Sequence, residues 1–339
     1  MTMLRSNRRA FSVAAGSATA YASSWLYDHS SNSGSSGNES RCDGMPSMGA
    51  KNNAPFAMGS SAASPVLPIR MLRPNPNIEI AFDVRTRTPL YVMEKLNKMM
   101  LPERGRGGRQ RRPNFFEDKN VETGSFRSKL SDYHKSGFDR GHMAPGADFP
   151  GESTVDTYTL CNIVPQDPVM NKGVWSSLEE WIRRLVHSND VPADADVYVV
   201  TGPLWLPRKQ VADGKFEYQH LGLGRPPSLV AVPTHLWKVV VVVPKDAQNS
   251  QGNPILRFAC FVIANEEASP SKKLEDYVVP WNDLETVTGL QFFPQWASPE
   301  WKEKADLITK FQVPVSLGGN SSRLFLTDRS AKNSSGNSK

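Results

Sequence analysis

The sequence predicts an α+β fold, a mixed α/β domain in which helices pack on a central, largely antiparallel sheet. Three observations lead to this class: a hairpin pattern early in the domain, one strongly amphipathic helix, and short apolar runs typical of buried strands after that helix. The chain has 339 residues, of which 39% are hydrophobic, and this is enough for a substantial core. We therefore expect a globular domain over most of the length.

The first 27 residues have the composition of a targeting segment. They carry Arg5, Arg8 and Arg9, are rich in alanine and serine, and contain no acidic residue. This pattern is typical of a mitochondrial presequence. A secretory signal or a short membrane anchor over residues 10–26 is the alternative. Its serine, glycine and threonine content makes a poor apolar span, so no stable transmembrane anchor is expected.

The rest of the chain divides by composition into three parts. Residues 28–65 are rich in serine, glycine and asparagine, which predicts a disordered linker. Residues 66–329 are expected to form the globular domain. Residues 330–339 form a polar tail.

The elements of the domain follow from their periodicity. Residues 78–96 alternate apolar and polar side chains on both sides of the polar sequence RTRT, as a hairpin does. Residues 171–189, "NKGVWSSLEEWIRRLVHSN", place apolar side chains at helical spacing over several turns. Three later runs, rich in β-branched and aromatic residues, predict largely buried strands at residues 195–206, 235–244 and 257–265.

The charge of the chain indicates which kind of partner it binds, and its cysteine content indicates which metal sites it can form. The chain has 40 lysines and arginines against 34 acidic residues, a net charge of +6, which favours an anionic partner such as nucleic acid or a lipid surface. Cys42, Cys161 and Cys260 are an odd number at wide spacing, which supports neither a disulfide framework nor a cysteine-based metal site. Any metal must therefore be held by oxygen or nitrogen.

Asn171 stands at the start of the predicted helix and on its apolar face. It lies seven positions before Leu178, so the two side chains point nearly the same way. An asparagine here would cap the helix by accepting a backbone N–H, or its carbonyl oxygen would bind a hard cation such as Mg²⁺.

Two adjacent glutamates of the same helix differ in their expected surroundings. Glu180 should face solvent and pair with Arg184, four positions later. Glu179 lies at the margin of the apolar stripe. It would pair with Arg183, or its carboxylate would orient water bound to a metal.

The stretch "SGFDRGHMAPGADF", residues 136–149, brings four polar or small residues together as Asp139, Arg140, Gly141 and His142. A lone histidine is commonly structural. A histidine with pKa near neutrality can also take a proton from water, and an arginine can bind a phosphoryl oxygen. Gly141 would allow a sharp bend. With a Mg²⁺ ion held by an asparagine, these are the parts needed for phosphodiester hydrolysis.

This stretch, together with "YTLCNIVPQDPVMNKGVWSSLEEW", "VYVVTGPLWLP" and "VAVPTHLWKVVVV", resembles the DNA/RNA non-specific endonuclease family, and its mitochondrial members most of all. The resemblance runs in collinear order from about residue 78 to residue 293. It implies a ββα-metal (His-Me finger) active site that cleaves DNA and RNA with Mg²⁺, for which Mn²⁺ substitutes, leaving 5′-phosphate and 3′-hydroxyl ends.

The resemblance also implies roles for individual residues. His142 would be the general base and Arg140 would stabilise charge on the phosphate. Asn171 would be the protein ligand of Mg²⁺ and Glu179 would orient its waters. Two residues would have supporting roles: Asp139 and Asn162.

The chain departs from the family pattern at two places. Cys161 stands where serine is common, and the stretch 115–119, "FFEDK", lacks an arginine. A second phosphate-binding arginine is expected just upstream, with Arg112 the best candidate and Arg111 the next. The basic run "RGRGGRQRR" is either a solvated loop or a set of phosphate contacts, in which we expect nucleic-acid binding by Arg104, Arg106, Arg109 and Arg111.

The resemblance further implies a homodimer in mitochondria, with relocation to the nucleus in cell death. Three alternatives remain at this point. They are an exonuclease-type paralogue of the same family, a non-catalytic nucleic-acid-binding protein, and a secreted nuclease.

Overall fold

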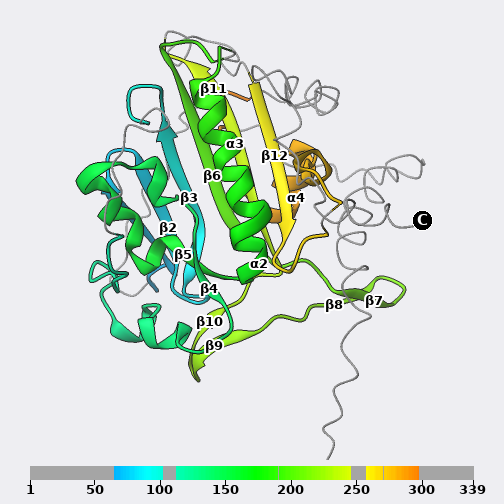
Figure 1. Ribbon diagram of the computed structural model, residues 1–339. Coiled ribbons are helices and arrows are strands. Elements are labelled where there is room, and N and C mark those ends of the chain that lie inside the picture. The colour runs from blue at the N-terminus through cyan, green and yellow to red at the C-terminus, as the bar shows by residue number, and fades with distance from the viewer. Residues whose placement is uncertain (1–64, 102–111, 190, 246–256, 270, 298–339) are drawn as a thin grey trace, which may run out of the picture.

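The computed structural model describes residues 65–101, 112–189, 191–245, 257–269 and 271–297 (Figure 1). Its centre is a six-stranded sheet in the order β1-β2-β3-β6-β11-β12, with every neighbouring pair antiparallel. The strands are β1 (Ile69–Asn75), β2 (Ile78–Asp83), β3 (Thr88–Leu96), β6 (Ala195–Leu204), β11 (His235–Pro244) and β12 (Arg257–Ala264). The predicted class, helices on an antiparallel-rich sheet, is confirmed.

The predicted hairpin and the three predicted buried strands are present as β2–β3, β6, β11 and β12. β11 is buried on both faces, since its alternate side chains belong to the two cores on opposite sides of the sheet. The sequence did not predict β1. This edge strand contains Arg70, Arg73 and Pro74 and is mostly half-buried or exposed, so it has little apolar periodicity to detect.

The central helix begins earlier than predicted and is kinked. It consists of α2 (Pro168–Met170), a π-helical turn (Asn171–Trp175) and α3 (Ser176–His187). Asp167 caps it by accepting two backbone N–H bonds on its Oδ1, so the capping interpretation of Asn171 was wrong. The non-helical backbone at Gly173 marks the kink.

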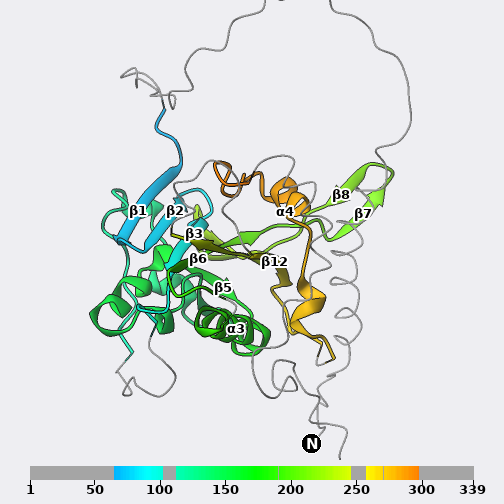
Figure 2. The ribbon, with the colours of Figure 1, turned by 90° about the horizontal axis from the view of Figure 1, so that it is seen from above.

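α3 packs as its amphipathic pattern predicts. Its apolar side chains are buried against the sheet, and Glu180 forms the expected pair with Arg184 at 2.6 Å. Seen from above, α3 and α4 (Trp281–Thr288) lie on opposite sides of the sheet (Figure 2). No helix of the described residues is long and apolar enough to cross a membrane.

Three two-stranded sheets complete the fold. β4 (Asp139–His142) pairs with β5 (Ile163–Gln166), and the two run directly into the central helix to make a ββα unit. The others are β7 (Lys209–Ala212) with β8 (Lys215–Glu217), and β9 (Gly222–Arg225) with β10 (Ser228–Ala231). Short 3₁₀ helices cover residues 124–126, 130–133, 146–148, 151–158, 160–162 and 274–277.

Several predictions lie outside the described residues. They are the presequence, the linker up to residue 64, the end of the domain at residue 329, the polar tail, and four arginines of the basic run. These stay predictions.

Candidate active site

Strand β4 carries the Asp-Arg-Gly-His stretch in an antiparallel register with β5. Gly141 lies opposite Val164, inside the strand, so the predicted bend at this glycine was wrong. The glycine is needed for close approach instead. A Cβ added to Gly141 would lie 2.0 Å from Cδ of the buried Gln166 side chain. A larger residue would push the strand away from its partner.

His142 is held between two aromatic rings. Its ring centroid lies 5.3 Å from that of Phe115 and 4.8 Å from that of Tyr158. Its Nε2 is buried and has no hydrogen-bond partner among the described residues. Burial, and to a lesser extent the charge of Arg112, lower the pKa of His142 to about 4. The imidazole is therefore neutral at physiological pH, which is the form that accepts a proton.

Two guanidinium groups lie close to His142. Arg140 is exposed and places its Cζ 4.5 Å from the centroid of the Phe115 ring, the same ring that contacts the histidine. Arg112 is also exposed, and its charge acts on the imidazole. Two exposed guanidinium groups that could bind a phosphate thus lie near the imidazole of His142.

Asn171 is oriented by the beginning of β4. Its Nδ2 donates to Asp139 Oδ2 at 3.1 Å, and Lys172 Nζ pairs with the same oxygen at 3.0 Å. Because the amide nitrogen is the group that bonds Asp139, the carbonyl oxygen of Asn171 is left as a hard donor. One such oxygen with water in the other positions suits Mg²⁺. Among the described residues no group of three or more His, Cys, Asp or Glu could hold a metal ion.

Asn162 supports the site through the backbone. Its side chain is fully buried, accepts the N–H of Ala144 at 2.9 Å, and donates to the carbonyl oxygens of Ala144 (2.9 Å) and Thr157 (2.8 Å). These bonds fix the chain two residues after His142. Asn162 therefore positions the strand that carries the base and does not bond the imidazole.

Glu179 is half-buried at the margin of a cluster of buried charged side chains that includes Glu94, Asp148 and Lys238. Burial raises the pKa of Glu179 to about 7, and it raises the pKa of Glu94 and of Asp148 as well. Arg183 donates to Asp148 at 2.9 Å, so the predicted pairing of Arg183 with Glu179 was wrong. Among the described residues, Glu179 has no hydrogen bond or ion pair with His142 or Asn171.

Lys238 is the cation that sequence reasoning missed. It is fully buried, and its Nζ donates to the carbonyl oxygen of Met143 at 2.9 Å and to Thr201 Oγ1 at 2.8 Å. It also lies 4.9 Å from the centroid of the Trp175 ring, whose Nε1 donates to the carbonyl oxygen of His142 at 3.4 Å. The signal was present, because Lys238 is the one charged residue in the apolar run "LWKVVVVV".

Comparison with known proteins agrees with this geometry. The family model for DNA/RNA non-specific endonucleases matches residues 62–298, which include every residue of the site described above. The chain belongs to this family. It is therefore a nuclease, an enzyme that hydrolyses phosphodiester bonds.

Individual members of the non-specific endonuclease family are similar over the same region. The mitochondrial nuclease of Saccharomyces cerevisiae is 36% identical over 241 residues, 70% of this chain and 69% of the yeast protein. Human mitochondrial endonuclease G is 36% identical over 229 residues, 67% of this chain and 70% of its own length. A crystal structure of an EndoG/EndoGI complex aligns with a TM-score of 0.56 and 30% identity, covering 68% of this chain and 87% of that one.

The structure thus brings most of the predicted site residues of this endonuclease together. His142 and Arg140 meet at Phe115, the charge of Arg112 acts on His142, and Asn171 meets Asp139 at the other end of β4. Glu179, on α3, lies apart from these residues and next to the buried charged side chains Glu94, Asp148 and Lys238. Four predicted phosphate contacts lie outside the described residues: Arg104, Arg106, Arg109 and Arg111.

Proposed function

We propose that the chain is a Mg²⁺-dependent endonuclease that cleaves DNA and RNA with little sequence preference, leaving 5′-phosphate and 3′-hydroxyl ends. The observation that carries the proposal is the neutral, unpartnered His142 imidazole beside two arginines, with the Asn171 amide oriented by Asp139 in the same ββα unit. A base, phosphate ligands and a hard oxygen donor are the groups that this hydrolysis requires.

In the proposed reaction His142 takes a proton from the water that attacks phosphorus. The phosphorus–O3′ bond breaks, and the leaving 3′-oxygen takes a proton from solvent. Arg140 and Arg112 bind the non-bridging phosphate oxygens, whose charge grows during attack. Asn171 would hold Mg²⁺, or Mn²⁺ in its place, and the cation supplies further charge neutralisation for the phosphate and the leaving oxygen. We propose that Glu179 would orient water bound to the cation.

Digestion of a supercoiled plasmid tests the proposal. With Mg²⁺ or Mn²⁺ the wild-type protein should nick and then linearise the circle, and EDTA should stop the reaction. His142→Ala should lower the rate by about 10²–10⁴-fold while the protein stays folded. Near wild-type activity of this variant would contradict the role of His142.

Two further results of the same assay are decisive. A protein that degrades linear DNA and leaves the closed circle intact would be the exonuclease-type alternative, which needs a free end. Asn171→Ala should abolish the dependence of the rate on Mg²⁺ concentration at micromolar to millimolar levels. An unchanged Mg²⁺ titration would remove Asn171 from the metal site.

We also propose that the protein acts in mitochondria as a homodimer and that it moves to the nucleus in cell death. The composition of residues 1–27 and the mitochondrial names of the two relatives support the location. A reporter fused to residues 1–65 tests it, since secretion of the reporter would favour the secreted alternative. Light scattering of the full chain measures the oligomeric state, which a monomeric mass would contradict.

A further inference from the structure

A large pocket lies beside the candidate active site and shares one residue with it. The pocket has a volume of about 1100 Å³ and is lined by residues of the 129–136 segment, by strands β9 and β10, and by Arg140 of β4. Ligand sites for drug-sized molecules commonly measure about 300–1000 Å³, so this one has room for more than a single small molecule. Because Arg140 belongs to both, a ligand in the pocket would continue directly into the catalytic site.

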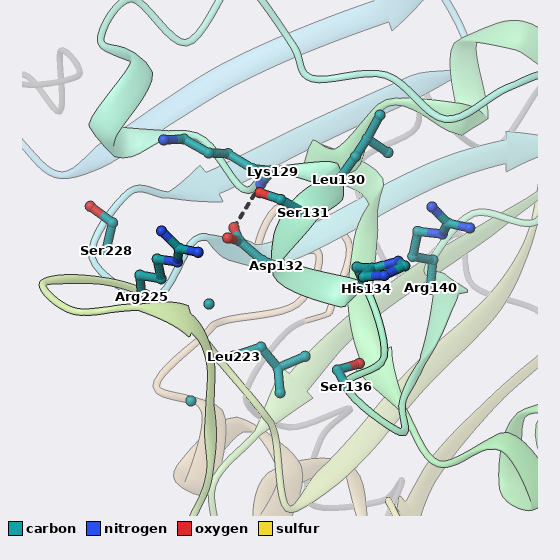
Figure 3. Close-up of a pocket in the computed structure, with 12 residues that line it drawn as sticks. Lys129, Leu130, Ser131, Asp132, His134, Ser136, Arg140, Leu223, Arg225 and Ser228 are labelled. Atoms are coloured by element: carbon teal, nitrogen blue, oxygen red, sulfur yellow. Dashed lines mark hydrogen bonds between the residues drawn. The ribbon is translucent and has the colours of Figure 1, made fainter.

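The lining of the pocket is cationic. Figure 3 shows Arg140 and His134 toward one end and Lys129 and Arg225 toward the other, with Asp132 between them. Within the described part of the chain, none of these four nitrogen-bearing side chains forms an ion pair with a carboxylate. Three permanent positive charges thus face one concave surface that has a single carboxylate.

That carboxylate is already engaged. Asp132 Oδ2 accepts the backbone N–H of Lys129 at 2.9 Å, and a Cβ added to Gly224 would lie 2.7 Å from Asp132 Oδ1. Asp132 therefore stabilises the 129–133 turn next to strand β9. The charge of Lys129 acts on this carboxylate, but no ion pair joins them among the described residues, so the ammonium group is available to a ligand. Gly224, with φ of +98°, lets the side chain of Asp132 lie this close to the backbone of β9.

The other lining residues indicate which part of a ligand is bound. Leu130 and Leu223 are apolar, and Ser131 and Ser228 carry hydroxyl groups, whereas the Ser136 hydroxyl donates to the carbonyl oxygen of Tyr133 at 3.0 Å. Among the described residues, no phenylalanine, tyrosine or tryptophan lines the pocket. Nucleic-acid sites that grip bases usually do so by stacking on aromatic rings. This pocket instead offers charges for phosphates, hydroxyls for polar atoms, and small apolar contacts for a sugar.

We propose that the pocket binds the sugar–phosphate backbone of the substrate strand, with the scissile phosphate at Arg140, at the end where His134 lies, and the neighbouring phosphate at Arg225 and Lys129. The proposal rests on the proposed nuclease function and extends it to substrate positioning. It also gives a physical reason for low sequence preference, because contacts to phosphates carry no base information.

The test removes the two cationic side chains at the end of the pocket away from Arg140 and leaves the catalytic residues unchanged. In the double variant Lys129→Gln, Arg225→Gln, binding of a single-stranded oligonucleotide is measured by fluorescence anisotropy in EDTA over a range of salt concentrations. Two lost phosphate contacts should weaken binding by about 2- to 30-fold. The slope of log K against log salt should become shallower by about 0.7, since each phosphate neutralised on a single strand contributes about 0.7 and the two side chains share one phosphate.

A matched control separates contact from net charge. Lys215→Gln, Lys245→Gln removes the same charge from exposed positions outside the pocket and should leave the slope close to that of the wild-type protein. Equal slopes for the pocket variant and the wild type, in a protein with unchanged thermal unfolding, would overturn the proposal.

A second measurement separates this inference from the proposed function. With Mg²⁺, the pocket variant should hydrolyse bis(p-nitrophenyl) phosphate at the wild-type rate, because this small diester needs only the catalytic residues. The same variant should show a raised KM and an unchanged kcat on the oligonucleotide. If the wild-type protein cleaves no diester at all, the proposed function fails, whereas the binding experiment in EDTA still decides the role of the pocket.

Discussion

Lys238→Met is the most informative change in the buried charge cluster, because methionine keeps most of the volume of lysine and removes its charge and its donors. In the wild-type protein Lys238 Nζ bonds the carbonyl oxygen of Met143 and Thr201 Oγ1. Burial raises the pKa of Glu179 and of Glu94, and the charge of Lys238 partly opposes that rise. The variant loses these interactions together.

The size of the loss follows from burial. Removing one partner of a buried charge pair costs about 3–5 kcal/mol. The two hydrogen bonds that Lys238 donates are worth about 1.5–3 kcal/mol each. This value is an independent estimate of the same loss, so it is not added to the cost of breaking the charge pair. We expect the free energy of unfolding to fall by about 3–5 kcal/mol at pH 8, where Glu179, with a pKa of about 7, is mostly ionised.

The loss should shrink at lower pH. The folded-state pKa of Glu179 is about 7, so this carboxyl takes up a proton as the pH falls from 8 toward 5.5, and burial raises the pKa of Glu94 as well. Neutral carboxyls do not need the counter-charge of Lys238. The variant therefore recovers part of its stability under acid conditions, relative to the wild-type protein.

Urea unfolding followed by tryptophan fluorescence at about pH 5.5 and pH 8 measures both effects. Lys245→Met, at an exposed position, is the matched control and should change stability by less than about 0.5 kcal/mol. A loss below about 1 kcal/mol at pH 8 for Lys238→Met, or an equal loss at both pH values, would refute the reasoning.

Three other predictions concern the free energy of unfolding. Gly141→Ala should lower the free energy of unfolding by about 1–3 kcal/mol, because the new methyl group meets Gln166; thermal denaturation equal to wild type would contradict this close approach. Asn162→Ala should cost about 2–4 kcal/mol and speed hydrogen exchange at the amide of Ala144, and wild-type exchange there would argue against its role. Burial lowers the folded-state pKa of His235 to about 4, so the unfolded chain binds more protons below pH 6.5. Stability should fall by about 3 kcal/mol from this group as the pH drops from 6.5 to 4, and His235→Gln should flatten that slope, as urea unfolding across the range would show.

The sequence predicted those elements whose pattern depends on burial. β2, β3, β6, β11 and β12 pack at least one face on the core, so their apolar residues show it. β1 lies at the edge of the sheet and contains charged side chains, so its sequence shows no alternation of apolar and polar residues. The helix start was misplaced because Asp167 caps a turn that has no apolar periodicity of its own, while the amphipathic stripe begins later.

The same limit applies to the site. Two short segments offered the histidine, the arginine and the asparagine as candidates, and the resemblance to the endonuclease family implied their roles. Spacing suggested Arg183 as the partner of Glu179, but Asp148, from a different segment, takes that arginine. Phe115 contacts His142, which lies 27 positions later in the chain. Lys238 bonds Met143, which lies 95 positions earlier. Such pairs depend on the folded chain, which a single sequence does not display.

The position of Phe115 has a consequence for how this enzyme can change. One ring supports both the imidazole of His142 and the guanidinium of Arg140. A substitution at Phe115 would therefore disturb the surroundings of both His142 and Arg140 in a single step. Effects of mutations at these three positions should be strongly non-additive, so a laboratory evolution path to new substrates would pass more easily through residues of the neighbouring pocket than through this ring.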